Sequence, residues 1–278
     1  MQEQILTYLD NRPPEPEPDR QGRVAIVASI GSGDESIAAW LKFHALAGVR
    51  DFHLYDDGAP AAAVEQAHRL AEKEGLKLTI MPWNLVVKTD YIKKNARTKL
   101  SSLLLAYCHA IGCYGSRCRW FAFIGTSDLM LPKKHATLAE PLQALQAYSN
   151  VSLPRREFAV FDKQGVQIEA TQLADAPRKS KQAYRCLVDP CKVWRLREDR
   201  CNTTDMGRRT ANDQGAVSWH CGPLSYRSRW SAFRSSASIQ LNHYALAGHA
   251  SETADASAIE FLKRHGFGSA EEFKASCP

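Results

Sequence analysis

The sequence lacks any apolar run that approaches the roughly 18 residues needed to cross a bilayer as a helix. Its first residues also lack a basic segment followed by an apolar one, so they do not form a recognisable signal peptide. The hydrophobic share of 44% and the charged share of 24% are ordinary for a soluble globular protein. We therefore expect a cytoplasmic protein, with peripheral association at a membrane surface left open.

The sequence also lacks the short motifs of several enzyme classes. It has no Gly-x-x-x-x-Gly-Lys phosphate loop, no Gly-x-Ser-x-Gly elbow and no His-Glu-x-x-His zinc motif. Its eight cysteines include no Cys-x-x-Cys pair, which argues against a structural zinc site. The net charge of +6 suits a nucleotide diphosphate or an anionic membrane surface. No nucleic-acid-binding module accompanies that charge, so we expect no nucleic-acid partner.

The chain changes character at residue 23. Residues 1–22 are a proline-rich lead-in that favours extended backbone, and apolar runs then alternate with segments of helical spacing. The predicted strands are 24–30, 52–55, 76–81 and 120–124, and the predicted helices are 37–46, 61–74, 97–111 and 256–265. Residues 34–36, Asp-Glu-Ser, offer an N-cap for the first helix. The pattern predicts one α/β domain over residues 23–278, with a mostly parallel central sheet, flanking helices and an irregular C-terminal portion.

The most informative stretch is residues 119–132. It begins as a buried apolar strand and stops abruptly at small polar residues and one carboxylate, Asp128. In an open α/β sheet, ligands bind at the carboxyl ends of the strands. The sequence therefore predicts a ligand site around Asp128.

Several segments together resemble glycosyltransferase family 92. Residues 119–132 are similar to its motif Trp-aromatic-x-aromatic-Ile-Asp-x-Asp-Glu-Phe-x-x-Pro, and residues 40–49 to Glu-Trp-x-x-aromatic-His-x-x-x-Gly-Val. Residues 52–58 are similar to aromatic-x-x-Tyr-Asp-Asn-Gly-Ser, and residues 241–244 end in the family's Asn-His-Tyr. Order and spacing agree along most of the chain. The resemblance implies a GT-A-like fold, with a nucleotide-binding part at 23–135 and an acceptor-side part at 136–278.

The resemblance breaks at the metal motif. Gly125 and Ser127 stand at the two aspartate positions of Asp-x-Asp, and Asp128 stands at the following glutamate position. A divalent ion at Asp-x-Asp normally neutralises the leaving diphosphate as a Lewis acid. The resemblance leaves Asp128 and His243 as the metal ligands, a small set for Mn or Mg. The alternative interpretation of His243 is a structural hydrogen bond.

The resemblance also implies an activity and its partners. The expected enzyme transfers a sugar from a nucleotide donor, a UDP-sugar with galactose as the family-based choice, to a glycan hydroxyl. Such a reaction belongs to cell-surface polysaccharide or glycoprotein synthesis. The alternative is an inactive GT-A relative that serves as a glycan-binding or partner-binding module, since the aspartates of the metal motif are missing.

Further residues take roles from the same resemblance. An inverting transfer needs a base for the acceptor hydroxyl, and the candidates are Asp128 and Glu157. The residues expected to bind the nucleotide are Ser29, Asp56 and Asp57, and those expected to bind the phosphates are Lys99, Arg155, Arg156 and Lys192. For two of these assignments, a purely structural role is the alternative interpretation. Asp56-Asp57-Gly58 is a competent turn by itself, and Glu157 has neighbouring arginines with which to form an ion pair.

Overall fold

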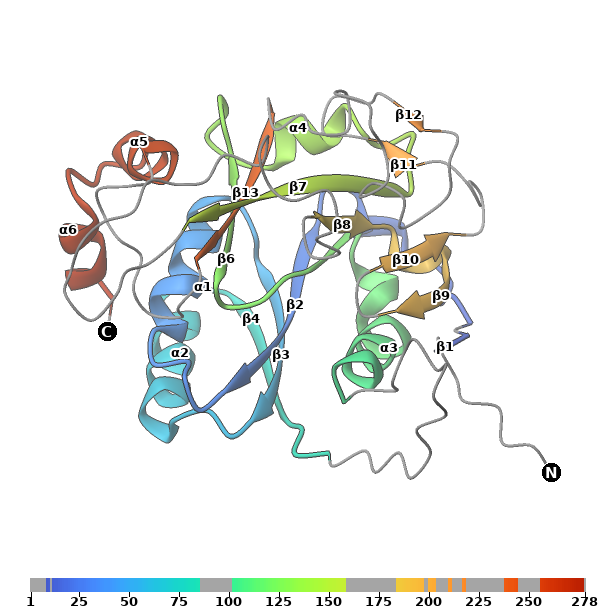
Figure 1. Cartoon of the computed structure of the whole chain (residues 1–278), viewed down its shortest axis with the longest axis horizontal. Helices are drawn as coiled ribbons and strands as arrows, with labels where there is room; N and C mark the ends of the chain where they lie inside the picture. The colour runs from blue at the N-terminus through green and yellow to red at the C-terminus, as the bar shows by residue number, and fades with distance from the viewer. Residues whose placement is uncertain are drawn as a thin grey trace.

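The structure is a computed structural model, and it describes residues 9–10, 12–85, 102–158, 184–197, 200–203, 210–211, 217–218, 238–244 and 256–277. A central sheet of ten strands runs through the molecule (Figure 1). Its parallel part consists of β2 (Val24–Gly31), β3 (Asp51–Asp57), β4 (Lys77–Pro82) and β5 (Trp120–Phe123). Their order in the sheet is β4-β3-β2-β5, and four further strands continue the sheet beyond β5.

Helices cover both faces of the parallel strands. The first three are α1 (Ile37–Leu46), α2 (Ala61–Glu74) and α3 (Ser102–Tyr114). Side chains of β2 alternate between two buried clusters: Ile26 and Ala28 pack with α1 and α2, whereas Ala25 and Val27 pack with α3. Both faces of β2 are therefore buried, and this explains why its sequence is a continuous apolar run. The predicted α/β fold with a mostly parallel, helix-flanked sheet is confirmed.

The second half of the sheet mixes directions. The strands are β6 (Asp128–Pro132), β7 (Asn150–Phe158), β8 (Tyr184–Val188), β11 (Thr210–Ala211), β12 (Val217–Ser218) and β13 (Ile239–Tyr244). Strand β8 is antiparallel to both β5 and β7, whereas β13 is parallel to β7 and antiparallel to β6. A separate small sheet joins β1 (Leu9–Asp10), β9 (Val193–Arg197) and β10 (Arg200–Thr203).

Short helices complete the described fold. They are α4 (Ala139–Gln143), α5 (Ala256–Arg264) and α6 (Ala270–Ala275), with 3-10 turns η1 (Pro18–Arg20), η2 (Gly115–Arg117) and η3 (Pro190–Lys192). The end of the lead-in is bound to the domain, because buried Arg20 forms an ion pair with Asp189. Among the described residues, no helix is long and apolar enough to cross a membrane.

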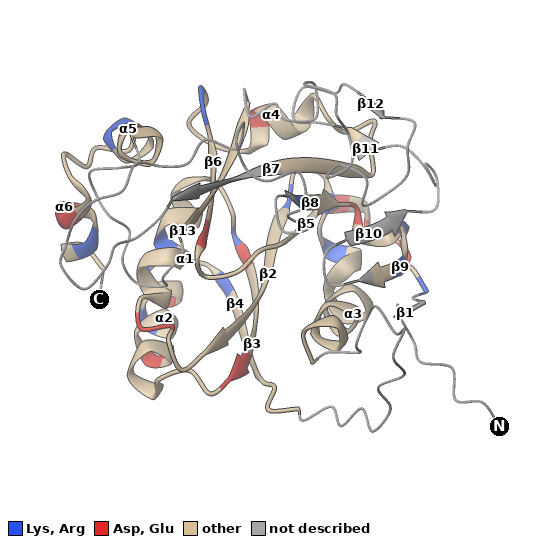
Figure 2. Cartoon of the chain, viewed as in Figure 1, with Lys and Arg blue, Asp and Glu red and all other residues tan. Residues whose placement is uncertain are grey.

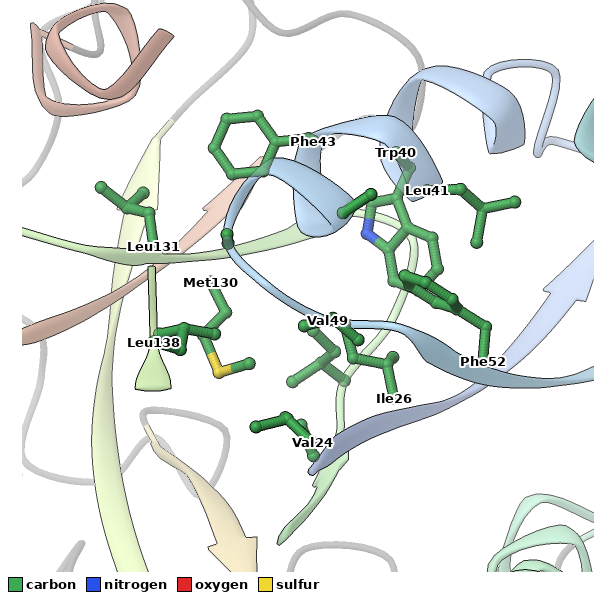
Figure 3. Close-up of a cluster of buried hydrophobic side chains, with 14 of the residues drawn as sticks. Val24, Ile26, Trp40, Leu41, Phe43, Val49, Phe52, Met130, Leu131 and Leu138 are labelled. Carbon is green, nitrogen blue, oxygen red and sulfur yellow. The ribbon is translucent and has the colours of Figure 1, made fainter. Parts of the chain in front are cut away.

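The packing of α1 on the sheet bears directly on the predicted site. Trp40 lies over Phe52 of β3, with ring centroids 6.1 Å apart, and belongs to the same buried cluster as Met130 and Leu131 of β6 (Figure 3). Burying aromatic side chains of this size is worth a few kcal/mol each. The helix that follows β2 is thereby packed against β6, the strand on which Asp128 lies.

Candidate functional site

The candidate site lies where β2, β3 and β5 end. These three strands are parallel, so their carboxyl ends meet at one edge, and the end of β3 is visibly acidic (Figure 2). The chain leaves β5 through Gly125, Thr126 and Ser127 and enters β6 at Asp128. The backbone N–H of Tyr244 donates to the carbonyl of Ser127, at 2.8 Å, and joins this loop to the end of β13.

Asp128 is the centre of the site. Its side chain is almost fully buried, yet both carboxylate oxygens have partners. Oδ2 accepts the backbone N–H of Gly125 at 3.0 Å and lies 3.9 Å from Nε of Arg185, while Oδ1 lies 2.7 Å from Nδ1 of His243. Burial alone would raise the pKa of Asp128, but the hydrogen bond from His243, the charge of Arg185 and the N–H of Gly125 together lower it. Asp128 is therefore ionised at neutral pH, and His243 donates its Nδ1–H to it.

Strand register places three of the predicted residues in one row. His243 of β13 lies opposite Asp128 of β6 and, on its other side, opposite Glu157 of β7. These pairings follow from the backbone register of the three strands. Three residues that are distant in sequence therefore occupy adjacent positions at this edge.

Two side chains of α1 support the strand that carries Asp128. Strand β6 pairs with β13 along one edge. On its other edge, Nε1–H of Trp40 donates to the carbonyl of Asp128 at 2.8 Å, and the N–H of Met130 donates to Nε2 of His44 at 3.1 Å. Trp40 and His44 are four residues apart and share one helix face. Because of this spacing, α1 supplies hydrogen-bond partners to two backbone groups of β6 that a neighbouring strand would otherwise bind.

His44 is held as a neutral imidazole in this contact. Its Nδ1–H donates to the carbonyl of Trp40 at 2.9 Å, so Nε2 is the acceptor that receives Met130. Burial lowers the pKa of His44 to about 4, against smaller opposing effects of the Trp40 carbonyl and of Asp128. The histidine of the resembled Trp-x-x-aromatic-His segment is therefore a support for β6.

Asp34 ties the loop after β2 to the loop after β5. Its Oδ2 accepts the N–H of Gly31 at 2.6 Å, and its Oδ1 accepts the hydroxyl of Thr126. The N-cap of α1 is Ser36, within the expected residues 34–36, but its side chain makes no capping hydrogen bond. The carboxylate of Asp34 is used between loops, which shapes the rim of the site.

The three residues expected to bind the nucleotide lie at or near this edge but differ in availability. Oδ1 of Asp56 accepts the N–H groups of Gly58 and Ala59 at 3.0 and 2.7 Å, as the turn interpretation requires. Asp57 is exposed and lies opposite Gly31, and Ser29 is half-buried within β2. Asp57 is thus the carboxylate whose exposure suits a ligand.

The residues expected to bind phosphate are not all brought together. Lys192 lies in η3, which directly follows Asp189. The N–H of Asp189 donates to the carbonyl of Ser149, which precedes β7. Lys192 therefore lies near the end of the sheet opposite to Asp128. Lys192 is the last residue of η3, and β9 begins one residue later. The backbone of Arg155 and Arg156 lies on β7 beside β13, while Lys99 is outside the described residues.

The protein donors around Asp128 do not fit a resident divalent ion. Mn and Mg prefer several oxygen ligands. Here one carboxylate and one imidazole are bonded to each other, and Arg185 already places positive charge near Oδ2. Within the described part of the chain, no group of three or more His, Cys, Asp or Glu side chains could hold a metal.

Sequence reasoning did not identify Arg185, Asp34 or the support role of Trp40 and His44. The i, i+4 spacing of Trp40 and His44 was visible, but their partners on β6 were not. Arg185 comes from β8, which is antiparallel to β5 and therefore begins beside the carboxyl end of β5. Only the pairing of these strands brings Arg185 to Asp128.

Comparison with known proteins agrees with this architecture. No curated protein matches the sequence at a significant level. The family model of glycosyltransferase family 92 matches residues 31–197, which is more than half of the 278 residues. The matched segment runs from the end of β2 to the end of β9 and includes Asp128 and Arg185. The chain belongs to glycosyltransferase family 92.

Proposed function

We propose that the protein transfers a sugar from a UDP-sugar, with UDP-galactose as the first choice, to a hydroxyl of a glycan in cell-surface polysaccharide or glycoprotein synthesis. The observation that carries this proposal is the row of Asp128, His243 and the Glu157 position at the carboxyl edge of the sheet. In a glycosyltransferase family, that edge is the natural place for donor and acceptor to meet.

The donor would lie along the ends of β2 and β3. Asp57 is exposed there and supplies an acceptor for the hydroxyls of ribose or the N–H of uracil, with Ser29 nearby. Positive charge for the diphosphate would come from Arg185, which is partly exposed beside Asp128. Arg155 and Arg156 stay the other predicted phosphate ligands. Guanidinium groups bind phosphate oxygens in a bidentate manner, so they can stabilise the leaving group.

Metal dependence would be weak in this arrangement. Asp128 already has two hydrogen-bond partners and a nearby arginine, so an ion would have to compete with them. We expect turnover without added Mn or Mg, or a metal effect only at high concentration.

A second candidate function rests on the two missing carboxylates. Gly125 and Ser127 remove the Asp-x-Asp ligands, and a descendant that only binds glycans or a partner protein would not need them. This module would bind oligosaccharide with an affinity that nucleotide does not change.

Thermal shift with a panel of nucleotides and nucleotide sugars separates the two functions. A donor at 100 times its dissociation constant stabilises the folded protein by about 2.7 kcal/mol, which corresponds to a rise of several degrees in Tm. We expect UDP-galactose or another UDP-sugar to give this rise, and Asp57→Ala to reduce it. Glu72→Ala, on the exposed face of α2, is the matched control and should respond like the wild type. No rise with any nucleotide or nucleotide sugar would refute the transferase.

A further inference from the structure

Two loops leave the carboxyl edge of the sheet next to each other. The β2 loop (residues 32–36) follows β2, and the β5 loop (residues 124–127) follows β5. The two strands are parallel neighbours, with Val27 opposite Phe123. In the proposed transferase, the donor lies at the ends of β2 and β3, whereas the β5 loop leads directly into Asp128. The relative position of the two loops therefore sets the position of Asp128 relative to the donor.

The carboxylate of Asp34 joins the two loops. Its Oδ2 accepts the N–H of Gly31 at 2.6 Å, and the backbone N–H of Asp34 donates to the carbonyl of Gly31 at 3.0 Å. These two contacts fix Asp34 at the end of β2. Its Oδ1 accepts the hydroxyl of Thr126 in the β5 loop. Hydrogen bonds from a hydroxyl to a carboxylate are charge-assisted and stronger than those between neutral groups, and both residues are half-buried.

The β5 loop depends on such contacts because its own side chains are small. Among the described residues, a Cβ added at Gly125 would meet only Oγ of Ser127 and Oδ2 of Asp128 within 4 Å. A metal ion at an Asp-x-Asp motif would bind this loop to the diphosphate, but Gly125 and Ser127 have no carboxylate to hold one. The bond between Thr126 and Asp34 instead attaches the loop to the donor side of the site.

The β5 loop in turn sets the position of Asp128. The N–H of Gly125 donates to Oδ2 of Asp128, and the N–H of Asp128 donates to the carbonyl of Gly125, both at 3.0 Å. Thr126 follows Gly125 directly, so a shift of its backbone also moves a donor of the buried carboxylate. Asp34 is thus linked to Asp128 through the hydroxyl of Thr126 and the backbone of the β5 loop.

We propose that Asp34 is a positioning residue of the transferase, and that its bond to Thr126 holds the β5 loop and Asp128 against the donor side of the site. This inference rests on the proposed function and adds to it a residue that acts through Thr126. A displacement of about 1 Å at a reacting centre can cost about 100-fold in rate. Loss of the bond therefore lowers kcat, while the nucleoside keeps its contacts at the ends of β2 and β3.

The first test removes the hydroxyl and keeps the shape of the side chain. Thr126→Val should lower kcat for transfer from UDP-galactose to the best acceptor of an oligosaccharide array by about 10-fold to 100-fold. The dissociation constant of UDP, measured by calorimetry, should stay unchanged. Thr126→Ser is the matched control: it keeps the hydroxyl and should keep wild-type kcat.

The second test removes the other partner of the bond. Asp34→Ala should also lower kcat by at least about 10-fold. The double variant Asp34→Ala with Thr126→Val should be no slower than Asp34→Ala alone, because the second change finds the contact already broken. Glu35→Ala, at the exposed neighbouring position of the β2 loop, is the control and should keep wild-type kcat.

The outcomes separate this inference from the proposed function. A wild type without turnover overturns the inference, and one that also binds no nucleotide sugar overturns the transferase as well. With an active wild type, the positioning role alone is overturned if Thr126→Val keeps more than about half of kcat, or if Thr126→Ser loses as much as Thr126→Val. Rate losses that multiply in the double variant overturn it too. Weaker UDP binding at unchanged kcat in Asp34→Ala would show that Asp34 binds the donor instead. If Asp34→Ala does not fold, the two Thr126 variants decide.

Discussion

Acid should weaken this fold through His44, the buried imidazole that supports β6. Protonation of Nε2 would replace an acceptor by a donor, which would then face the N–H of Met130. Protonation of His44 is therefore unfavourable in the folded protein, where burial lowers its pKa from the ordinary value of 6.5 to about 4. Between these values the unfolded chain binds a proton that the folded chain does not. The stability that depends on neutral His44 is therefore fully present above about pH 6.5 and is lost as the pH falls towards 4.

The magnitude follows from the separation of the folded and unfolded pKa values. Over each full pH unit between them, the free energy of unfolding changes by about 1.36 kcal/mol, and lowering the pH from 7 to 5 crosses roughly one and a half such units. His44 should thus cost the fold about 2 kcal/mol over that interval. His53 contributes a similar loss, because burial, assisted by Arg117 and His109, also lowers its pKa to about 4. Together the two histidines should reduce the free energy of unfolding by about 4 kcal/mol.

Urea unfolding at pH 7 and pH 5 measures this loss in the wild type and in His44→Gln. The glutamine does not titrate, and its amide can still accept from Met130 and donate to Trp40. We expect the variant to lose about 2 kcal/mol less than the wild type between the two pH values, whatever its stability at pH 7. Subtracting the pH-dependent change of the variant from that of the wild type removes the contributions of all other titrating groups, which the two proteins share. His68→Gln, exposed on α2, should behave like the wild type, and an equal acid loss in His44→Gln would refute the reasoning.

Two further predictions concern the charge of the site. Asp128→Asn replaces one carboxylate oxygen by an NH2 group, so either Gly125 or His243 loses its acceptor and the negative charge is removed. We expect kcat to fall by about 100-fold to 10,000-fold, and unfolding to cost about 1–3 kcal/mol less because a buried donor loses its partner. Unchanged turnover would show that Asp128 has no part in catalysis. Gly125→Asp combined with Ser127→Asp restores the two carboxylates of the metal motif. A Cβ added at residue 125 would lie 3.8 Å from Oγ of Ser127 and 3.9 Å from Oδ2 of Asp128, which are ordinary contacts. Calorimetry should then show Mn binding that the wild type lacks, and tight Mn binding by the nucleotide-free wild type would contradict the assignment.

The fold was predictable because its signals are local. The helix 61–74 was predicted with its observed bounds: Gly75 takes φ 63°, a left-handed conformation that stops a helix and favours glycine. The strand at 24–30 was predicted because both of its faces are buried, which removes polar residues from it. The predicted start of the third helix, at residue 97, falls outside the described residues, whereas α3 begins at Ser102 where they resume.

The site was predictable only in part. Asp128 could be found because the apolar strand before it ends abruptly, and His243 because of its Asn-His-Tyr segment. Their hydrogen bond is not a local property, since it depends on the antiparallel pairing of β6 with β13 across 115 residues of sequence. Arg185 was missed for the same reason. Lys192 was proposed for phosphate, but its turn follows β8, whose reversed direction carries it away from Asp128.

The loss of the two aspartates and the contacts of Asp128 have one electrostatic explanation. A buried carboxylate is costly unless donors or cations compensate it. In an Asp-x-Asp site the compensation comes from a metal ion, whereas here Gly125, His243 and Arg185 supply it from the protein itself. Additional carboxylates at positions 125 and 127 would raise the negative charge beyond what these groups balance. Their absence is therefore consistent with a site in which the protein itself already compensates the charge of Asp128.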